Sequence, residues 1–251
     1  MILTHNPSEN PQLHTIFSPS TQTWQFILAD PSSKHAVIID PVLDNSITSK
    51  AISTTAADAL LAIILKNDYI IDRILETNSS ADWPSAARYL RTQIWEKKGY
   101  KPRVAAKKSL NILKRMHFRK YCLTNRQWEK DFDGAFADGE KFLVGSLTVR
   151  VMRLSGRSKC HVGYRVGDLL ITGDCVFHAE QAGVSKSDYE SIQASMRRVL
   201  SLPKGIVYTT SMCRAGAKEA VVDDGDNNKA AMACQGVIAG VAVVLNSGIV
   251  S

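Results

Sequence analysis

The apolar positions of this chain form short buried runs and helical stripes that alternate along most of its length. Ile70 to Leu75 is typical of a buried strand, and the polar segment after it is followed by a helix expected over Pro84 to Trp95. That helix carries Ala86, Ala87, Leu90 and Ile94 on one face. Further strands are predicted over Leu147 to Leu154, His161 to Val166 and Leu169 to Thr172, separated by turns at glycines.

The same patterning predicts elements at both ends of the chain. Two early strands are expected over Trp24 to Asp30 and Ala36 to Asp40, and a helix over Thr55 to Lys66. Later helices are expected over Ser109 to Arg119, Ser187 to Leu200 and, in the uncharged C-terminal stretch, from about Lys229 to Leu245. The last of these would dock on the rest of the fold or on a second subunit.

Three ordered motifs resemble the metallo-β-lactamase fold and, within it, the branch of persulfide dioxygenases and glyoxalase-II-like proteins. They are the segments 23–44, 136–147 and 171–177, which look like the first hairpin, the A-D-G-E turn with its two strands, and the G-D-T-L-F strand end of that branch. The resemblance covers roughly residues 12 to 210. It implies an α/β fold, a four-layer αββα sandwich, in a single domain with a basic helical insert at 91–130 and a divergent tail at 222–251.

The resemblance also indicates where metal ligands would stand, and most of them are replaced. In the T-H-x-H-x-D-H loop, the three histidines fall on Asn78, Ser80 and Trp83, and only Asp82 is retained. A further histidine falls on Arg157, the bridging aspartate is present as Asp174, and the last histidine falls on Ser211. Zinc and iron sites of this kind need imidazoles beside the carboxylates, so we expect no metal and no cofactor.

Electrostatics suggests what replaces the metal. Two facing carboxylates without a cation would repel, and the planar fork of Arg157 can bind a carboxylate through two hydrogen bonds. We therefore hypothesise an ion pair between Arg157 and Asp174, shared with Asp82. In one interpretation the pair only fills a vacated cavity; in the other it belongs to a rebuilt site, with His178 as a proton-transfer group. Asn78, Ser80, Trp83, Lys159, His161 and Ser211 would then border the substrate.

Charge along the chain is uneven. Residues 91–130 hold thirteen lysines and arginines against two glutamates, so the remainder carries a net charge of −4 within a total of +7. This segment is either a solvated helical face or a surface for an anionic or carrier-bound substrate. Its aromatic residues match no nucleic-acid motif, and neither nucleic acid nor a membrane is expected as a partner. A homodimer is a candidate assembly.

Composition places the chain among globular, cytoplasmic proteins. A 45% apolar content in 251 residues is enough for a full core, and five cysteines without metal or disulfide spacing are typical of a reducing compartment. No basic segment followed by an apolar run opens the sequence, so a secretory signal is not expected.

Three functions follow from these observations. The first is a metal-independent tailoring enzyme of secondary metabolism, an isomerase, lyase or cyclase acting on a small organic or polyketide-like compound in the former metal cleft. The second is a non-catalytic pseudoenzyme that binds a ligand or a protein partner. The third, which the donor set favours least, is a residual metallohydrolase that recruits His161 or His178. An active persulfide dioxygenase, glyoxalase II or β-lactamase is not expected.

Overall fold

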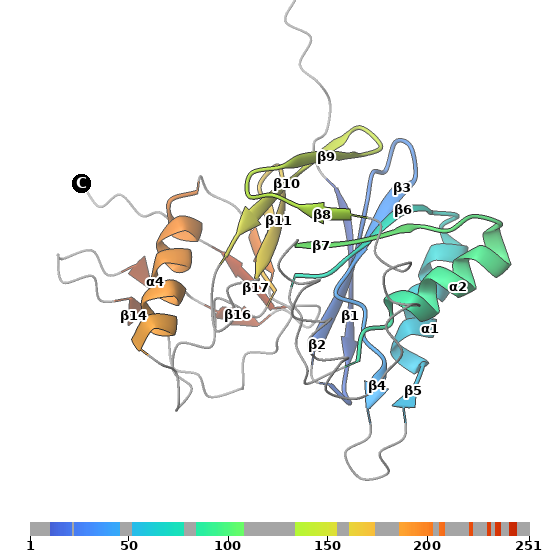
Figure 1. Ribbon diagram of the computed structural model, residues 1–251, viewed down its shortest axis with the longest axis horizontal. Helices are drawn as coiled ribbons and strands as arrows, with labels where there is room; N and C mark the ends of the chain where they lie inside the picture. Colours follow the sequence, from blue (N-terminus) through green and yellow to red (C-terminus); the bar gives the residue numbers. More distant parts are fainter. Residues whose placement is uncertain are drawn as a thin grey trace, which may run out of the picture.

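The protein forms four layers, with two β-sheets packed face to face and helices outside each sheet. The structure is a computed structural model. It describes residues 11–21, 23–45, 52–77, 84–107, 134–154, 161–173, 186–202 and 206–208, together with short C-terminal strand segments at 221–222, 230–231, 234–236 and 241–244. Figure 1 shows α1 and α2 on the outer side of one sheet and α4 on the outer side of the other. The predicted αββα architecture is confirmed.

The first sheet has six strands in the order β1-β2-β3-β6-β7-β8. The strands are β1 (Gln12–Ser18), β2 (Thr23–Ala29), β3 (His35–Ile39), β6 (Ile70–Leu75), β7 (Arg103–Lys107) and β8 (Gly134–Phe136). β1, β2 and β3 pair antiparallel, whereas β3, β6, β7 and β8 run parallel. A short two-stranded pair, β4 (Asp44–Asn45) with β5 (Ile52–Ser53), leads into α1.

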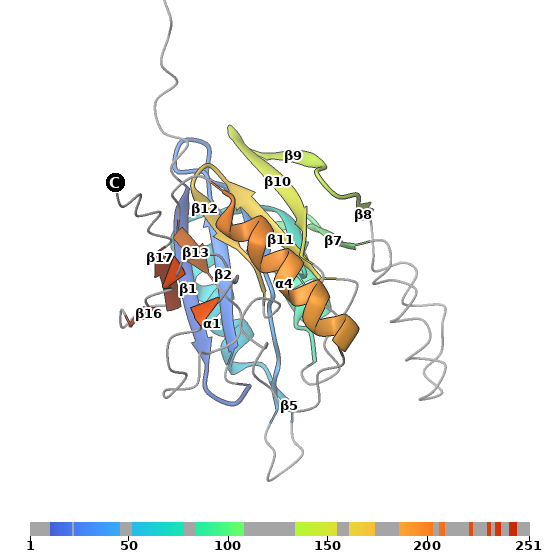
Figure 2. The same ribbon diagram turned by 90° about the vertical axis from the view of Figure 1, so that its left-hand side faces the viewer.

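The second sheet has seven strands in the order β16-β17-β13-β12-β11-β10-β9. They are β9 (Lys141–Val144), β10 (Leu147–Arg153), β11 (Val162–Val166), β12 (Leu169–Ile171), β13 (Ile206–Tyr208), β16 (Cys234–Gly236) and β17 (Val241–Val244). A separate pair joins β14 (Val221–Val222) to β15 (Ala230–Ala231). Figure 2 shows α4 (Lys186–Leu200) lying across the outer face of this sheet, over β11.

The buried side chains form two layers because neighbouring residues in a strand face opposite ways. One layer lies between the sheets and includes Phe26, Leu28, Val37 and Tyr164. The other lies between the first sheet and its helices, and includes Ile27, Ile38 and the buried faces of α1 (Thr55–Lys66) and α2 (Ala87–Lys98). The near-continuous apolar runs of β2 and β3 follow directly from being covered on both faces.

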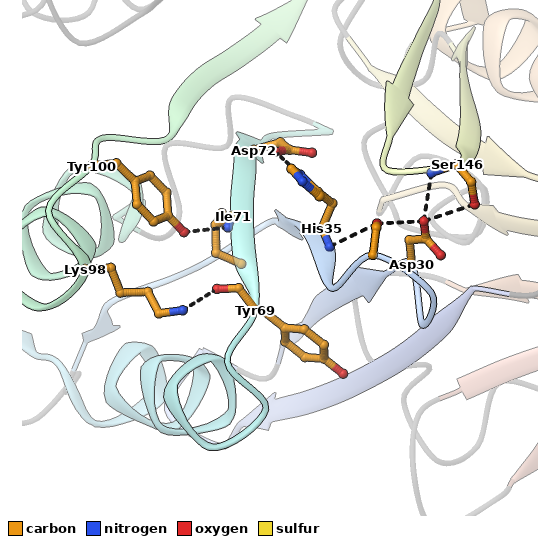
Figure 3. A network of polar contacts seen from close by, with 9 residues as sticks. Asp30, His35, Tyr69, Ile71, Asp72, Lys98, Tyr100 and Ser146 are labelled. Carbon is orange, nitrogen blue, oxygen red and sulfur yellow. Dashed lines mark hydrogen bonds and ion pairs between the residues drawn. The ribbon is translucent and has the colours of Figure 1, made fainter.

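Asp30 joins the two sheets at the end of β2. Its carboxylate accepts hydrogen bonds from Ser32 and Ser33 in its own turn, and from both the backbone N (2.7 Å) and the hydroxyl (3.0 Å) of Ser146 in the β9–β10 turn. These donors hold the pKa of Asp30 well below its usual value, against the opposing effect of burial. Figure 3 shows the Asp30 contacts beside the pairs formed by His35 with Asp72 and by Tyr100 with the backbone of Ile71.

Most predicted elements are confirmed, with shifts that have local causes. α1 and β6 have the predicted bounds, but α2 begins at Ala87, three residues later than expected. The delay arises because residues 84–86 pair with residues 41–43 instead: the Leu43 N donates to the Pro84 carbonyl, and the Ala86 N donates to the Pro41 carbonyl, each at 2.9 Å. α2 ends at Gly99, whose φ of 79° suits glycine.

The C-terminal helix expected over Lys229 to Leu245 is wrong. The described parts of that segment are β15, β16 and β17, and β17 pairs antiparallel with β13 from Ile206↔Val244 to Tyr208↔Ala242. Three of the four residues of β17 are valines, whose branched side chains favour a strand. The open edge of β13 supplies backbone partners, so sheet pairing prevails over the helical pattern.

Some expectations fall on parts of the chain that the structure does not describe. The helix expected over Ser109 to Arg119 lies outside the described residues, as does most of the basic segment. Within residues 91–107, however, the chain forms the end of α2 and the whole of β7, so this part belongs to the sandwich itself. Of the helices in the described part of the chain, none is long and apolar enough to cross a membrane.

Candidate functional site

Three strand ends meet at one edge of the sandwich and form the base of the candidate site. In the first sheet, β3 is followed by Asp40, and β6 is followed by Glu76 and Thr77. In the second sheet, β12 is followed by Thr172 and Gly173. β3 and β6 are parallel, and the Asp40 N donates to the Leu75 carbonyl at 2.9 Å. The carboxyl ends of parallel strands are where open α/β sheets place their ligand-binding loops.

Asp40 fixes the point where β6 becomes the loop 78–83. Its Oδ1 accepts a hydrogen bond from the Thr77 N at 2.7 Å, and its Oδ2 accepts one from the Thr77 hydroxyl at 2.5 Å. Asp40 is almost fully buried and has a φ of 51°, a conformation that is uncommon for residues other than glycine. The strained backbone is tolerated because the surrounding contacts hold it in place, as is common beside functional sites.

The far end of the same loop is tethered to the same stretch of chain. The backbone bonds that join residues 84–86 to residues 41–43 place the start of α2 beside the segment that follows Asp40. Gln25, which is fully buried, accepts a hydrogen bond from the Val42 N at 2.9 Å and so attaches that segment to β2. The chain on either side of residues 78–83 is therefore attached to the same stretch, residues 40–43.

Tyr164 of β11 lies beneath the site. It is fully buried, and its hydroxyl donates to the Glu76 carbonyl at 2.9 Å. Burial, and then the nearby negative charges of Asp40 and Glu76, raise the pKa of Tyr164 well above its usual value. The phenol therefore stays protonated and serves as a hydrogen-bond donor across the two sheets.

Gly173 allows the second sheet to approach Thr77 closely. A Cβ atom at Gly173 would lie 2.3 Å from the Thr77 hydroxyl oxygen, and the φ of this glycine is 68°. From the same sheet, the Val162 N donates to the Thr77 carbonyl at 2.9 Å. Thr77 is thus the meeting point of β3, β11 and β12, immediately before the predicted ligand loop.

His161 is the one predicted site residue that the structure describes. It is buried, with 3% of its surface exposed, and its carbonyl accepts a hydrogen bond from the Leu154 N at 3.1 Å. It directly precedes Val162, whose N donates to the Thr77 carbonyl, and its role as a border of the substrate stays a prediction. The other predicted residues lie outside the described part: Asn78, Ser80, Asp82, Trp83, Arg157, Lys159, Asp174, His178 and Ser211. Their roles, and the Arg157–Asp174 pair, stay predictions.

The sequence did not identify the residues that position the site, here called its frame. Asp40, Thr77 and Tyr164 were assigned to strands or turns and given no role at the site. A signal was available at Asp40, because an aspartate followed by proline directly after an apolar run marks a strand end that uses its carboxylate locally. Nothing in the sequence indicated Tyr164, since its partner is a backbone carbonyl.

A metal ion does not fit the residues that the motifs align with ligand positions. Asn78, Ser80, Trp83 and Arg157 offer an amide, a hydroxyl, an indole and a permanent cation where imidazoles would be required. The donor chemistry therefore argues against the metal that the fold implies.

Comparison with known proteins establishes the family. The sequence model of the metallo-beta-lactamase superfamily matches residues 21–211, which include most strands of both sheets and every strand end of the site. The chain belongs to the metallo-beta-lactamase superfamily. The superfamily match explains the parallel core of the first sheet and the position of the site at its carboxyl edge.

Two curated relatives are about one third identical to this chain over the residues that align. A "Beta-lactamase hydrolase-like protein" of Xylella fastidiosa is 32% identical over 201 residues, covering 78% of this chain and 45% of the relative. A "Glyoxylase B2" of Dictyostelium discoideum is 32% identical over 194 residues, covering 73% of this chain and 64% of that protein. The chain thus spans about half the length of the Xylella relative.

Solved structures of the superfamily confirm the fold. ETHE1 from Myxococcus xanthus superposes with a TM-score of 0.60 at 18% identity, over 81% of this chain and 77% of that one. The BLEG-1 B3 metallo-beta-lactamase gives a TM-score of 0.56 at 19% identity, over 80% of this chain and 92% of that one. At these identities the likeness concerns the arrangement of helices and strands alone.

Proposed function

We propose that this protein acts without a metal, as a cofactor-free isomerase, lyase or cyclase on a small organic substrate bound where its relatives would bind metal. One observation supports the proposal most directly. The frame that presents the loop, Asp40 with Thr77, is intact, while the loop itself carries Asn78 and Ser80 at positions aligned with histidines. A maintained frame with altered donors is consistent with a reused cleft.

Arg157 would supply the positive charge of the reused cleft. A guanidinium binds a carboxylate or a developing enolate through two parallel hydrogen bonds, and it needs no bound water to do so. Asp174 follows Gly173 directly, so it would enter the cleft from the second sheet, and Asp82 would enter from the loop 78–83. Paired with one cation, two carboxylates titrate at different pH values, which suits one of them to remove a proton and the other to stay ionised.

Residual metal-dependent hydrolysis is the second candidate, favoured by the relatives that are 32% identical and carry the names hydrolase-like protein and glyoxylase. It would need His161 or His178 as a ligand. His161 is buried against the base of the site and precedes a strand that is tied to Thr77, so its ring would have to serve from that fixed position.

Metal content separates the two candidates. The full chain is incubated with zinc or iron, desalted and analysed by elemental mass spectrometry, beside a variant that carries Asn78→His, Ser80→His and Arg157→His. We expect metal well below one equivalent in the wild type and a clear increase in the triple variant, because imidazoles are restored on an intact frame. One equivalent in the wild type would refute the proposal and support the hydrolase.

The catalytic interpretation requires a separate test from the non-catalytic one. Once a panel of small carboxylic acids and polyketide-like compounds yields a turnover assay, Asp174→Asn should abolish turnover while Asp168→Asn, in the exposed β11–β12 turn, leaves it unchanged. Unfolding is measured alongside, because removing one partner of a buried ion pair costs about 3–5 kcal/mol. Full turnover by a folded Asp174→Asn variant would remove this residue from the mechanism.

A further inference from the structure

Two arginines lie side by side on neighbouring strands of the first sheet, Arg73 half-buried and Arg103 exposed. Arg73 of β6 and Arg103 of β7 are register partners in a parallel pair, so their Cα atoms are about 4.8 Å apart and their side chains share a face. Both lie within their strands, upstream of the loops that form the candidate site.

A β-bulge places Arg73 on the inner face. The register of β3 with β6 shifts between Ala36 and Val37, so that Ile71 pairs with Ala36 but Arg73 pairs with Val37. The extra residue is Asp72, and without it the alternation would direct Arg73 toward the helices. Because Val37 belongs to the apolar layer between the sheets, its partner Arg73 enters the same layer.

Arg73 stacks on aromatic rings there. Its guanidinium carbon lies 4.7 Å from the ring centre of Phe142 in β9 and 5.9 Å from that of Phe136 in β8. The two rings are themselves stacked, with centres 4.9 Å apart. Stacking fixes the plane of the guanidinium and leaves its N–H groups, which lie in that plane, available to a further partner.

No such partner is present among the described residues. The Nε of Arg73 is buried and makes no hydrogen bond, and neither arginine forms an ion pair in this part of the chain. Burial and the charge of Arg103 both lower the pKa of Arg73, which reflects two like charges held close together. Stacking accounts for the position of the Arg73 guanidinium, but it supplies neither a hydrogen-bond acceptor nor a negative charge.

The two carboxylates near Arg73 are already engaged elsewhere. Asp72 bonds the Nδ1 of His35 at 2.7 Å, and Figure 3 shows its carboxylate directed toward that ring. Glu140 accepts a hydrogen bond from the Ala137 N at 2.7 Å in its own turn. Both acidic groups contribute negative potential at Arg73, but neither bonds it.

We propose that Arg73 and Arg103 together bind the phosphate group of a small phosphate monoester, at a site separate from the candidate cleft. Two guanidinium charges match the roughly two negative charges that such a group carries near neutral pH, and each can donate two hydrogen bonds to its oxygens. A single carboxylate would neutralise only one of the two arginines. The positive excess of the sequence around Arg103 also raises the local concentration of anions.

The test titrates inorganic phosphate and glycerol phosphate into the full chain at constant ionic strength, with binding measured by calorimetry. We expect saturable binding that Arg103→Gln weakens by about tenfold or more, since it removes charge-assisted hydrogen bonds. Arg197→Gln is the matched control, because it removes the same charge from the exposed face of α4. Arg73→Lys, which keeps the charge but not the planar fork, should weaken binding as well.

Each outcome decides the proposal. Tighter binding of glycerol phosphate than of inorganic phosphate supports an ester ligand, and equal binding supports a site for free phosphate. Absence of saturable binding, or equal affinities in Arg103→Gln and Arg197→Gln, overturns the site. Acetate that binds as tightly as phosphate overturns the assignment to a phosphate group. These results are independent of metal content, so the site and the proposed function fail separately.

Discussion

Replacing Asp30 by asparagine tests how the two sheets are held together. Five hydrogen bonds converge on this carboxylate: two from Ser32, one from Ser33 and two from Ser146. Asparagine keeps one acceptor oxygen and turns an NH₂ group toward donors on the other side. At least two bonds are lost, and the new amide group is itself shut off from water, because the residue at position 30 is only 1% exposed.

The expected loss of unfolding free energy is about 3 kcal/mol. A hydrogen bond to a charged group contributes about 1.5–3 kcal/mol, at least two such bonds are lost, and the serines that donate them are exposed, so water can replace the lost acceptor. Part of this is recovered if the amide rotates to keep its oxygen on the Ser146 side. The change should be measured by urea denaturation, with Asp168→Asn as the matched control, since Asp168 is exposed and forms no hydrogen bond among the described residues.

The effect of Asp30→Asn should also depend on pH. The folded-state pKa of Asp30 is lowered by its donors, so its contribution is complete above the unfolded pKa of about 3.9 and is lost as pH falls toward the folded value. The wild type and the variant should therefore converge in stability below about pH 4. If both aspartate variants unfold at the same urea concentration at pH 7, the link between the sheets does not carry the energy assigned to it.

Three further results are expected. Gly173→Ala should lower the free energy of unfolding in urea by more than Gly99→Ala. Both glycines have a positive φ, but only at Gly173 would the new methyl group meet Thr77. Equal losses of unfolding free energy would mean that backbone strain alone is responsible. Tyr164→Phe should cost about 1–2 kcal/mol in the same assay, because it removes the buried hydrogen bond to the Glu76 carbonyl, and an unchanged midpoint would contradict this. Burial lowers the pKa of His14, so the folded state binds fewer protons there than the unfolded state does. The free energy of unfolding should therefore fall as the pH drops through about 6.5. His14→Gln should reduce the difference in this free energy between pH 8 and pH 5.

Sequence patterning predicted the elements that depend on local rules. The bounds of α1 and β6 were predicted to the residue, because an amphipathic helix and a short buried run each carry their own periodicity. The start of α2 was not, since it depends on pairing with residues 41–43, which lie far away in the sequence. The helix expected over Lys229 to Leu245 is wrong for the same reason, because β17 forms by pairing with β13, which is distant in the sequence.

The candidate site likewise has parts that the sequence predicts and parts that it does not. Its aligned positions are predicted from motif spacing, and of these residues the structure describes His161, which is buried. The frame around Thr77 was not indicated, because Asp40, Tyr164 and Gly173 act there through contacts across strands and between sheets. No periodicity encodes such contacts.

The anchoring of the loop 78–83 has a consequence for how this lineage could change. Its two ends are secured by Asp40, by residues 41–43 and by backbone pairing, and none of these contacts involves a side chain that would coordinate an ion. The bonds of residues 40–43 with Thr77 and with residues 84–86 involve no residue of the intervening stretch, so a change of sequence there removes none of them. Natural selection can therefore replace side chains at positions 78–83 while these bonds on either side of the stretch stay available.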